Sequence, residues 1–120
     1  MKVISVQNLT NEKITSSLFT APVKLQIPFA DSDESDLSIA YVTFPNGAHN
    51  KFHKHSTDQV LIVTKGEGFV ATEKKKYPIK KGDIVLIPAG EVHKHGAREG
   101  KNFTHIAITR TNSKLTQVQR

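Results

Sequence analysis

Two groups of histidines stand in this sequence at spacings suited to metal binding. His53 and His55 are separated by one residue, and because alternate residues of a strand point to the same face, both imidazoles can reach one centre. Gln59 follows closely and offers a side-chain oxygen, while His93 arrives on a separate predicted strand. Three imidazoles and one amide oxygen form a suitable ligand set for one divalent transition metal with coordination positions left open.

The amide at position 59 has a consequence for the chemistry. A glutamate there would cancel one unit of the metal's charge, whereas three histidines and Gln59 leave the whole divalent charge in a medium of low dielectric constant. This favours Lewis-acid chemistry on a bound hydroxyl, carbonyl or water, and it disfavours oxidation of the metal. The ligand set suits Mn, Fe, Co, Ni, Cu and Zn, so these residues do not determine which of these metals binds.

Two further histidines are candidates for proton transfer. His95 lies two residues after His93 on the same predicted strand, hence on the same inward face, and His105 lies on the next core strand. If both line the cavity, the cation lowers their pKa and keeps at least one imidazole neutral near pH 7, as a general base requires. Alternatively, His95 orients a metal ligand and His105 is a hydrogen-bonded core residue. Small or apolar side chains are predicted to share this lining, either as a substrate pocket or as ordinary core packing: Ala40, Val42, Leu61, Ala107 and Thr109.

The elements that must position these residues are strands. Helical periodicity is weak, and short β-branched and apolar runs recur with turn signals between them, which predicts an all-β sandwich or barrel. The segment 60–63 is expected to end at Lys65-Gly66, and the polar, basic segment 111–120 is expected to be a loosely ordered tail. The expected strands are 1–9, 23–29, 37–44, 60–63, 69–72, 76–79, 84–87, 92–95 and 103–109.

The two histidine segments resemble the two motifs of the cupin superfamily. They match at nearly every defined position: Gly47-x5-His53-x-His55-x3-Gln59-x6-Gly66 and Gly82-x5-Pro88-x-Gly90-x2-His93-x3-Ala97. Gln59 stands where the family usually has a ligating Glu, and Ala97 stands where it usually has Asn. The resemblance implies a single-domain antiparallel jelly-roll β-barrel over residues 1–120, with its core at roughly 20–110.

A narrower resemblance fits both departures from the motifs. Four runs are similar to the small single-domain cupins that include the manganese-dependent hydroxynitrile lyases: residues 53–55, 59–64, 88–97 and 104–108. This resemblance implies a manganese-dependent enzyme that cleaves and forms cyanohydrins, with a histidine such as His95 moving the proton. Two alternatives stay open, namely a quercetinase-type dioxygenase and a non-catalytic cupin that binds a small ligand.

Composition limits the cellular setting and the partners. The 120 residues suit one domain, and the absence of cysteine excludes disulfides, iron–sulfur clusters and thiol nucleophiles. No apolar run is long enough for a transmembrane helix and the N-terminus does not resemble a signal peptide, so a cytoplasmic protein without a membrane partner is expected.

The net charge of +6 raises the question of nucleic acid. The densest basic runs, Lys74–Lys76 and Lys80-Lys81, bracket a predicted turn, and no nucleic-acid-binding motif accompanies them, so no such partner is expected. The expected partners are a small-molecule substrate and a second copy of the chain, because a homodimer would cover the sheet edges.

Overall fold

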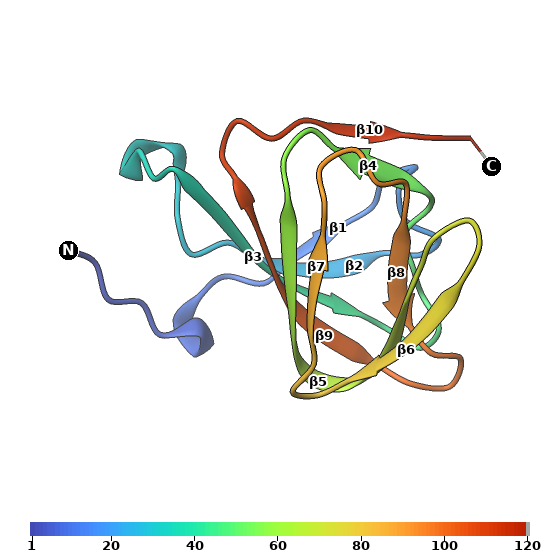
Figure 1. Ribbon diagram of the computed structural model, residues 1–120. Helices are drawn as coiled ribbons and strands as arrows, with labels where there is room; N and C mark the ends of the chain where they lie inside the picture. Colours follow the sequence, from blue (N-terminus) through green and yellow to red (C-terminus); the bar gives the residue numbers. More distant parts are fainter. Residues whose placement is uncertain (120) are drawn as a thin grey trace.

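Antiparallel strands make up almost all the regular structure of this computed structural model, which describes residues 1–119 (Figure 1). The described residues contain ten strands: β1 (Glu12–Ile14), β2 (Val23–Gln26), β3 (Leu37–Phe44), β4 (His53–His55), β5 (Gln59–Ala71), β6 (Lys76–Lys80), β7 (Ile84–Ile87), β8 (Lys94–Ala97), β9 (Phe103–Arg110) and β10 (Leu115–Gln117). Two single-turn 3-10 helices, η1 (Val6–Asn8) and η2 (Asp31–Asp33), accompany them. The all-β prediction is confirmed.

The long strand β5 organises the sheet. Eight strands form one sheet in the order β1-β2-β3-β9-β5-β6, and β7 and β8 also pair with β5. The first residues of β5 pair with β7 and the last with β8, so the same strand belongs to two walls of the molecule. The register with β9 shifts between Val63 and Lys65. This irregularity lets β5 bend, which curves the sheet around its core.

Gly66 lies at the bend of β5. The sequence predicted two strands here, separated by a turn at Lys65-Gly66, and this prediction is wrong because β5 runs through both residues. Gly66 has a φ of 77°, and a Cβ added to it would overlap the backbone carbonyl of Asn102. Both the left-handed backbone and the close approach require glycine. The glycine therefore marks a bend inside a strand.

The apolar core lies between β3, β5 and β9. Phe44, Leu61 and Phe103, one from each strand, are fully buried, and the two phenylalanine rings lie 6.1 Å apart. The predicted strand 37–44 is confirmed as β3, in which Val42 and Phe44 are buried whereas Leu37 is exposed. These three strands therefore form the apolar side of the barrel.

Both ends of the chain differ from the prediction. Residues 1–9 contain η1 and no strand, so the strand predicted there is wrong, and Val3 faces solvent. The segment 111–120, of which 111–119 are described, holds β10 where a loose tail was expected. β10 pairs with β4, and Val118 donates a backbone hydrogen bond to Phe52 (2.9 Å). The tail is ordered because it satisfies the backbone groups along the edge of β4.

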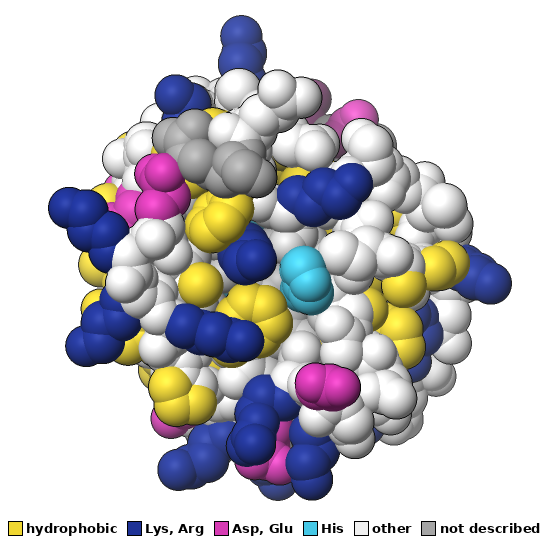
Figure 2. Space-filling view, turned by 90° about the vertical axis from the view of Figure 1, so that its right-hand side faces the viewer, with side chains coloured by type: hydrophobic (Ala, Val, Ile, Leu, Met, Phe, Trp, Pro, Cys, Tyr) yellow, Lys and Arg dark blue, Asp and Glu magenta, His cyan; other side chains and the backbone are white. Residues whose placement is uncertain are grey.

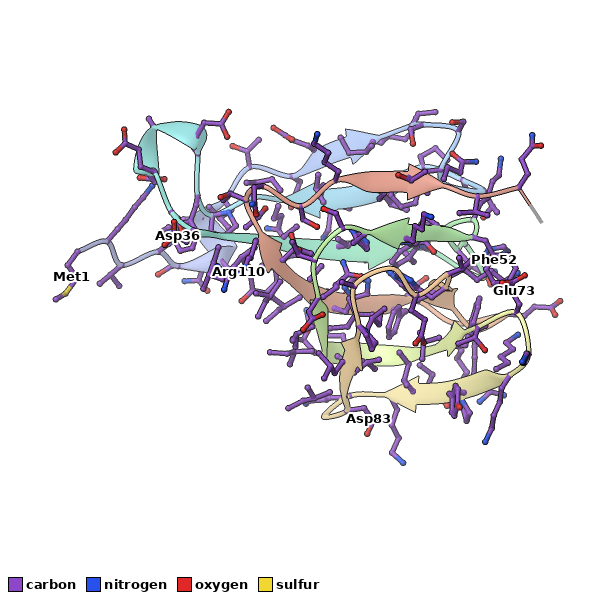
Figure 3. The ribbon with its side chains drawn as sticks, turned by 45° about the horizontal axis from the view of Figure 1, so that its top comes forward. Met1, Asp36, Phe52, Glu73, Asp83 and Arg110 are labelled. Carbon is purple, nitrogen blue, oxygen red and sulfur yellow. The ribbon has the colours of Figure 1, made fainter. Side chains whose placement is uncertain are left out.

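Short polar contacts fix the turns around the barrel. Figure 3 shows Asp36 near Arg110, where β3 begins and β9 ends, and there the backbone N–H of Thr111 donates to the carbonyl of Asp36 (3.1 Å). Asp83 lies at the turn between β6 and β7, where its carboxylate accepts the backbone N–H of Lys80 at 2.9 Å. The first contact joins the end of β9 to the start of β3, and the second closes the turn that leads into β7.

Lysine and arginine side chains are spread over the face shown in Figure 2, and several of them gather at its lower edge around acidic side chains. Within residues 1–119, no helix has the length and apolar character needed to cross a membrane.

Candidate metal centre

Three histidines from neighbouring segments converge inside the barrel. His53 and His55 begin and end β4, and His93 stands directly before β8. His53 and His93 exchange both backbone hydrogen bonds, each 2.9 Å long, which ties the two segments together. One ring nitrogen from each of His53, His55 and His93 lies within 4.8 Å of the others. The structure thus brings together the three histidines whose spacing indicated a metal site.

Backbone carbonyls orient two of these rings. Nδ1 of His53 lies 2.7 Å from the carbonyl oxygen of Lys51, and Nδ1 of His93 lies 2.8 Å from that of Glu91. A carbonyl oxygen only accepts, so in each case Nδ1 carries the hydrogen and donates it. The Nε2 of each neutral ring is left with its lone pair, which is the form that binds metals. The same local contact, from histidine to the residue two positions before it, occurs in both segments.

Burial keeps the three imidazoles neutral. It lowers the pKa of His53 to about 4 and that of His55 to about 4, and the neighbouring His93 adds a smaller effect in the same direction. Burial also lowers the pKa of His93, although Glu91 opposes this. Desolvation inside the barrel is the main cause of these lowered pKa values, without any bound cation. The ligand nitrogens are therefore deprotonated near pH 7.

Gln59 occupies the first position of β5 and is buried. Its Oε1 has no hydrogen-bond partner among the described residues, and the same holds for Nε2 of His55 and Nε2 of His93. Unpartnered buried acceptors are costly unless something binds them, and these are all metal-ligand atoms. The three-histidine cluster fits a divalent metal site. Ligation by Gln59 remains a prediction that its unpartnered oxygen supports.

His95 and His105, the two histidines predicted to transfer protons, lie inside the barrel. Both are buried, and their ring centroids are 4.9 Å apart. Burial lowers the pKa of His105 to about 4, and burial together with the nearby His105 holds the pKa of His95 well below its usual value. Both nitrogens of His105 lack partners among the described residues, so the alternative of a hydrogen-bonded core histidine does not describe it.

The five predicted pocket residues lie on the three neighbouring strands β3, β5 and β9. Val42 is the register partner of His105, and Ala107 pairs with both Ala40 and Leu61, while Thr109 stands opposite Ser38. Val42 and Leu61 belong to the buried core, and Ala40 and Ala107 pack against it. None of these residues lines the cavity that reaches His93. Their role as a substrate pocket therefore remains a prediction.

A cavity of about 480 Å³ opens beside the histidine cluster and is lined in part by His93. Its walls come from β5, β6 and β7, with apolar side chains such as Ile79 and Ile87, and with Tyr77 and Glu91 as polar members. This volume is in the range of small-molecule sites. This lining was not predicted from the sequence, because β6 and β7 meet there by pairing with different parts of β5.

Asn50 is a second residue that the sequence analysis missed. It is buried, and its side chain contacts His95 through both the oxygen and the nitrogen of its amide. Nothing in its position, three residues before His53, distinguishes it from a loop asparagine.

Comparison with known proteins gives a consistent result. The family model described as a cupin domain matches residues 40–109. An (R)-mandelonitrile lyase from Granulicella tundricola is 35% identical over 109 residues, which are 90% of this chain and 83% of that protein.

Solved structures share the fold. A cupin-like protein from Thermotoga maritima superimposes with a TM-score of 0.82 at 33% identity, over 88% of this chain and 83% of that one. The polyketide cyclase RemF from Streptomyces resistomycificus has a TM-score of 0.88 at 14% identity, over 100% and 87% of the two chains, a likeness of fold alone. The predicted antiparallel jelly-roll barrel is confirmed. With its three-histidine centre in that barrel, this chain belongs to the cupin family.

Proposed function

We propose that this cupin is a metal-dependent lyase that cleaves and forms cyanohydrins or closely related hydroxyl and carbonyl compounds. The observation that carries the proposal is the 35% identity to an (R)-mandelonitrile lyase along 90% of the chain. The neutral histidine cluster beside a cavity of about 480 Å³ supports it, since a small organic substrate would lie next to the ligand nitrogens.

The expected reaction needs groups that move a proton and a Lewis acid that polarises the substrate oxygen. In the cleavage direction the bond between the carbinol and nitrile carbons breaks, its electron pair leaves with cyanide, the hydroxyl loses its proton and cyanide gains one. A divalent cation held by His53, His55, His93 and Gln59 supplies Lewis acidity toward the substrate oxygen, and manganese is the ion that the hydroxynitrile lyase resemblance favours. We assign the movement of the proton to the neutral imidazoles of His95 and His105.

The side chains of the cavity have separate tasks. Apolar residues such as Ile79 and Ile87 exclude water around an organic substituent, and they favour an aryl or alkyl group over a charged one. The carboxylate of Glu91 at the same cavity disfavours anionic substrates.

The test is turnover of (R)-mandelonitrile by the manganese-loaded protein. We expect benzaldehyde and cyanide in equal amounts with no uptake of dissolved oxygen, measured by absorbance, cyanide assay and an oxygen electrode. Oxygen uptake with a flavonol or phenolic substrate, and none of the cleavage, would indicate the dioxygenase alternative. Binding of such ligands without turnover would indicate a non-catalytic cupin, and either result would contradict the proposal.

A further inference from the structure

Asn50 holds His95 through three hydrogen bonds. The backbone N–H of His95 donates to Oδ1 of Asn50 at 2.8 Å, and Nδ2 of Asn50 lies 3.3 Å from Nε2 of the His95 ring. The backbone N–H of Asn50 donates to the carbonyl of His95 at 3.0 Å. Both residues are buried, 3% and 4% exposed, so water does not compete for these contacts.

The backbone bond removes the ambiguity in the orientation of the amide. A backbone N–H only donates, so the amide atom that faces it must be the oxygen. The NH₂ group of Asn50 then faces the His95 ring, and it donates to Nε2. A nitrogen that accepts this hydrogen bond carries the lone pair, so the hydrogen of the neutral ring resides on Nδ1.

We propose that Asn50 is a positioning residue that fixes neutral His95 in the tautomer with its hydrogen on Nδ1. That Nδ1 is buried and has no partner among the described residues, and the rings of His53, His93 and His105 surround His95 at centroid distances of 5.7, 5.7 and 4.9 Å. A buried N–H without an acceptor is costly, so this donor is available to an acceptor atom of a ligand that reaches the histidine cluster.

The tautomer changes the role that the sequence suggested for His95. The sequence analysis expected a general base, but a ring with its hydrogen on Nδ1 offers a donor there. It takes up a proton only at Nε2, where the amide of Asn50 lies. The inference rests on the proposed function only in assigning this donor to proton delivery. The tautomer follows from the hydrogen bonds alone.

The tautomer is measurable by ¹⁵N NMR of the zinc-loaded full chain at pH 8, because zinc is diamagnetic. Long-range ¹⁵N–¹H correlations distinguish the protonated ring nitrogen from the one that carries the lone pair. We expect His95 to show its hydrogen on Nδ1. A wild-type spectrum with the hydrogen on Nε2 would overturn the inference by itself, whether or not any variant folds.

The variant Asn50→Asp exchanges the donor for an acceptor and keeps an oxygen for the backbone N–H of His95. We expect Nε2 of His95 to gain a hydrogen, with the fold retained. Asn46→Asp is the matched control, because the Oδ1 of Asn46 also accepts a backbone N–H, that of Gly100 at 2.7 Å. It should leave the His95 spectrum unchanged. An Asn50→Asp spectrum identical to that of the wild type would overturn the role of Asn50.

Turnover of (R)-mandelonitrile separates this inference from the proposed function. We expect kcat of Asn50→Asp to fall by about tenfold or more with KM little changed, since loss of a positioned acid or base costs at least this much. Asn46→Asp should keep the wild-type kcat. Full kcat in Asn50→Asp with the exchanged tautomer would contradict the positioning role. An inactive wild type would contradict the proposed function and leave the NMR result standing.

Discussion

The imidazoles of the metal centre are prepared for ligation before any ion arrives. Burial disfavours their charged forms, and the carbonyls of Lys51 and Glu91 place the hydrogens of His53 and His93 on Nδ1. An ion entering the site therefore displaces no protons from these rings near pH 7. The ring orientations are thus set by the backbone, because each carbonyl belongs to the residue two positions before its histidine.

A substitution at position 59 tests how the charge of this predicted ligand affects metal affinity. We expect Gln59→Glu to bind a divalent ion as tightly as the wild type or more tightly, because a carboxylate adds an anionic oxygen at the same place. Isothermal titration of the metal-free protein with Mn²⁺ measures this. Gln26→Glu adds the same charge on β2 and should leave the Kd unchanged. Loss of binding in Gln59→Glu would show that Gln59 is not a ligand.

Burial of the histidines predicts a pH dependence of stability in the metal-free protein. The folded-state pKa values of His53, His55 and His105 are lowered to about 4, below the unfolded value of 6.5. The unfolded chain therefore takes up more protons between these values. We expect the free energy of unfolding from urea titrations to be highest above about pH 6.5 and to fall as the pH drops toward 4.

The variant His105→Phe checks the origin of this slope. His105 packs against Phe44 and Phe103, at ring distances of 5.5 and 5.4 Å, so an aromatic ring of similar size fits the same place. Its removal should flatten the pH dependence, because one buried titrating group is lost. A wild-type stability that does not change between pH 7 and pH 5 would contradict the account.

The ligand histidines could be predicted from the sequence, but the residue that hydrogen-bonds His95 could not. The alternation of a strand places His53 and His55 on one face whatever the rest of the fold does, and the motif places His93 opposite them. Asn50 contacts His95 across forty-five positions, a pairing that depends on how the segment before β4 meets β8. No local pattern encodes that meeting.

At the scale of elements, the bend in β5 lets one strand pair with β7 near its start and with β8 near its end. We expect Gly66→Ala to lower the free energy of unfolding by at least about 1–3 kcal/mol, the usual cost of a strained backbone conformation. The added Cβ meets the carbonyl of Asn102, so the cost exceeds that of the φ angle alone. Chemical denaturation measures the loss.

Gly82→Ala is the control for this prediction. Gly82 also has a positive φ, 96°, but a Cβ there would meet open space. It should destabilise the protein less than Gly66→Ala does. Equal losses in the two variants would show that the contact with Asn102 has no effect.

The sequence predicted the central strands well, but it did not predict the structure of the two terminal segments. β3 and β9 have apolar sequences whose burial a barrel requires, and their predicted ranges agree with the structure closely. The predicted range of β7 also agrees, although Ile84 and Leu86 on this strand are exposed. β10 has a polar sequence, and it is a strand only because β4 lies beside it. Such pairing is a property of the tertiary structure, as is the failure of residues 1–9 to find a partner.

At the scale of the whole molecule, we propose a homodimer. Ile84 and Leu86 on β7 are 70% and 64% exposed, and within the described residues β7 pairs with β5 alone. An edge strand with outward apolar side chains is stabilised when a second copy covers it. We expect a dimer at micromolar concentration in sedimentation velocity, and a monomer for the double variant Ile84→Lys, Leu86→Lys.

Leu37→Lys is the control for the dimer, because Leu37 is an exposed apolar residue on another strand, β3. It should leave the sedimentation coefficient unchanged. A wild type that sediments only as a monomer contradicts the proposal.

Metal content per chain tests the central claim most directly. After the purified protein is stripped, reloaded with Mn²⁺ and dialysed, elemental analysis should find one ion per wild-type chain. His53→Ala and His93→Ala should lose most of it, since each removes a buried neutral ligand. His49→Ala should keep it, because His49 is outside the cluster and its Nδ1 donates to the carbonyl of Asn50 at 2.9 Å. A wild type that retains no metal, or a His93→Ala variant that retains it fully, would contradict the assignment of this metal centre.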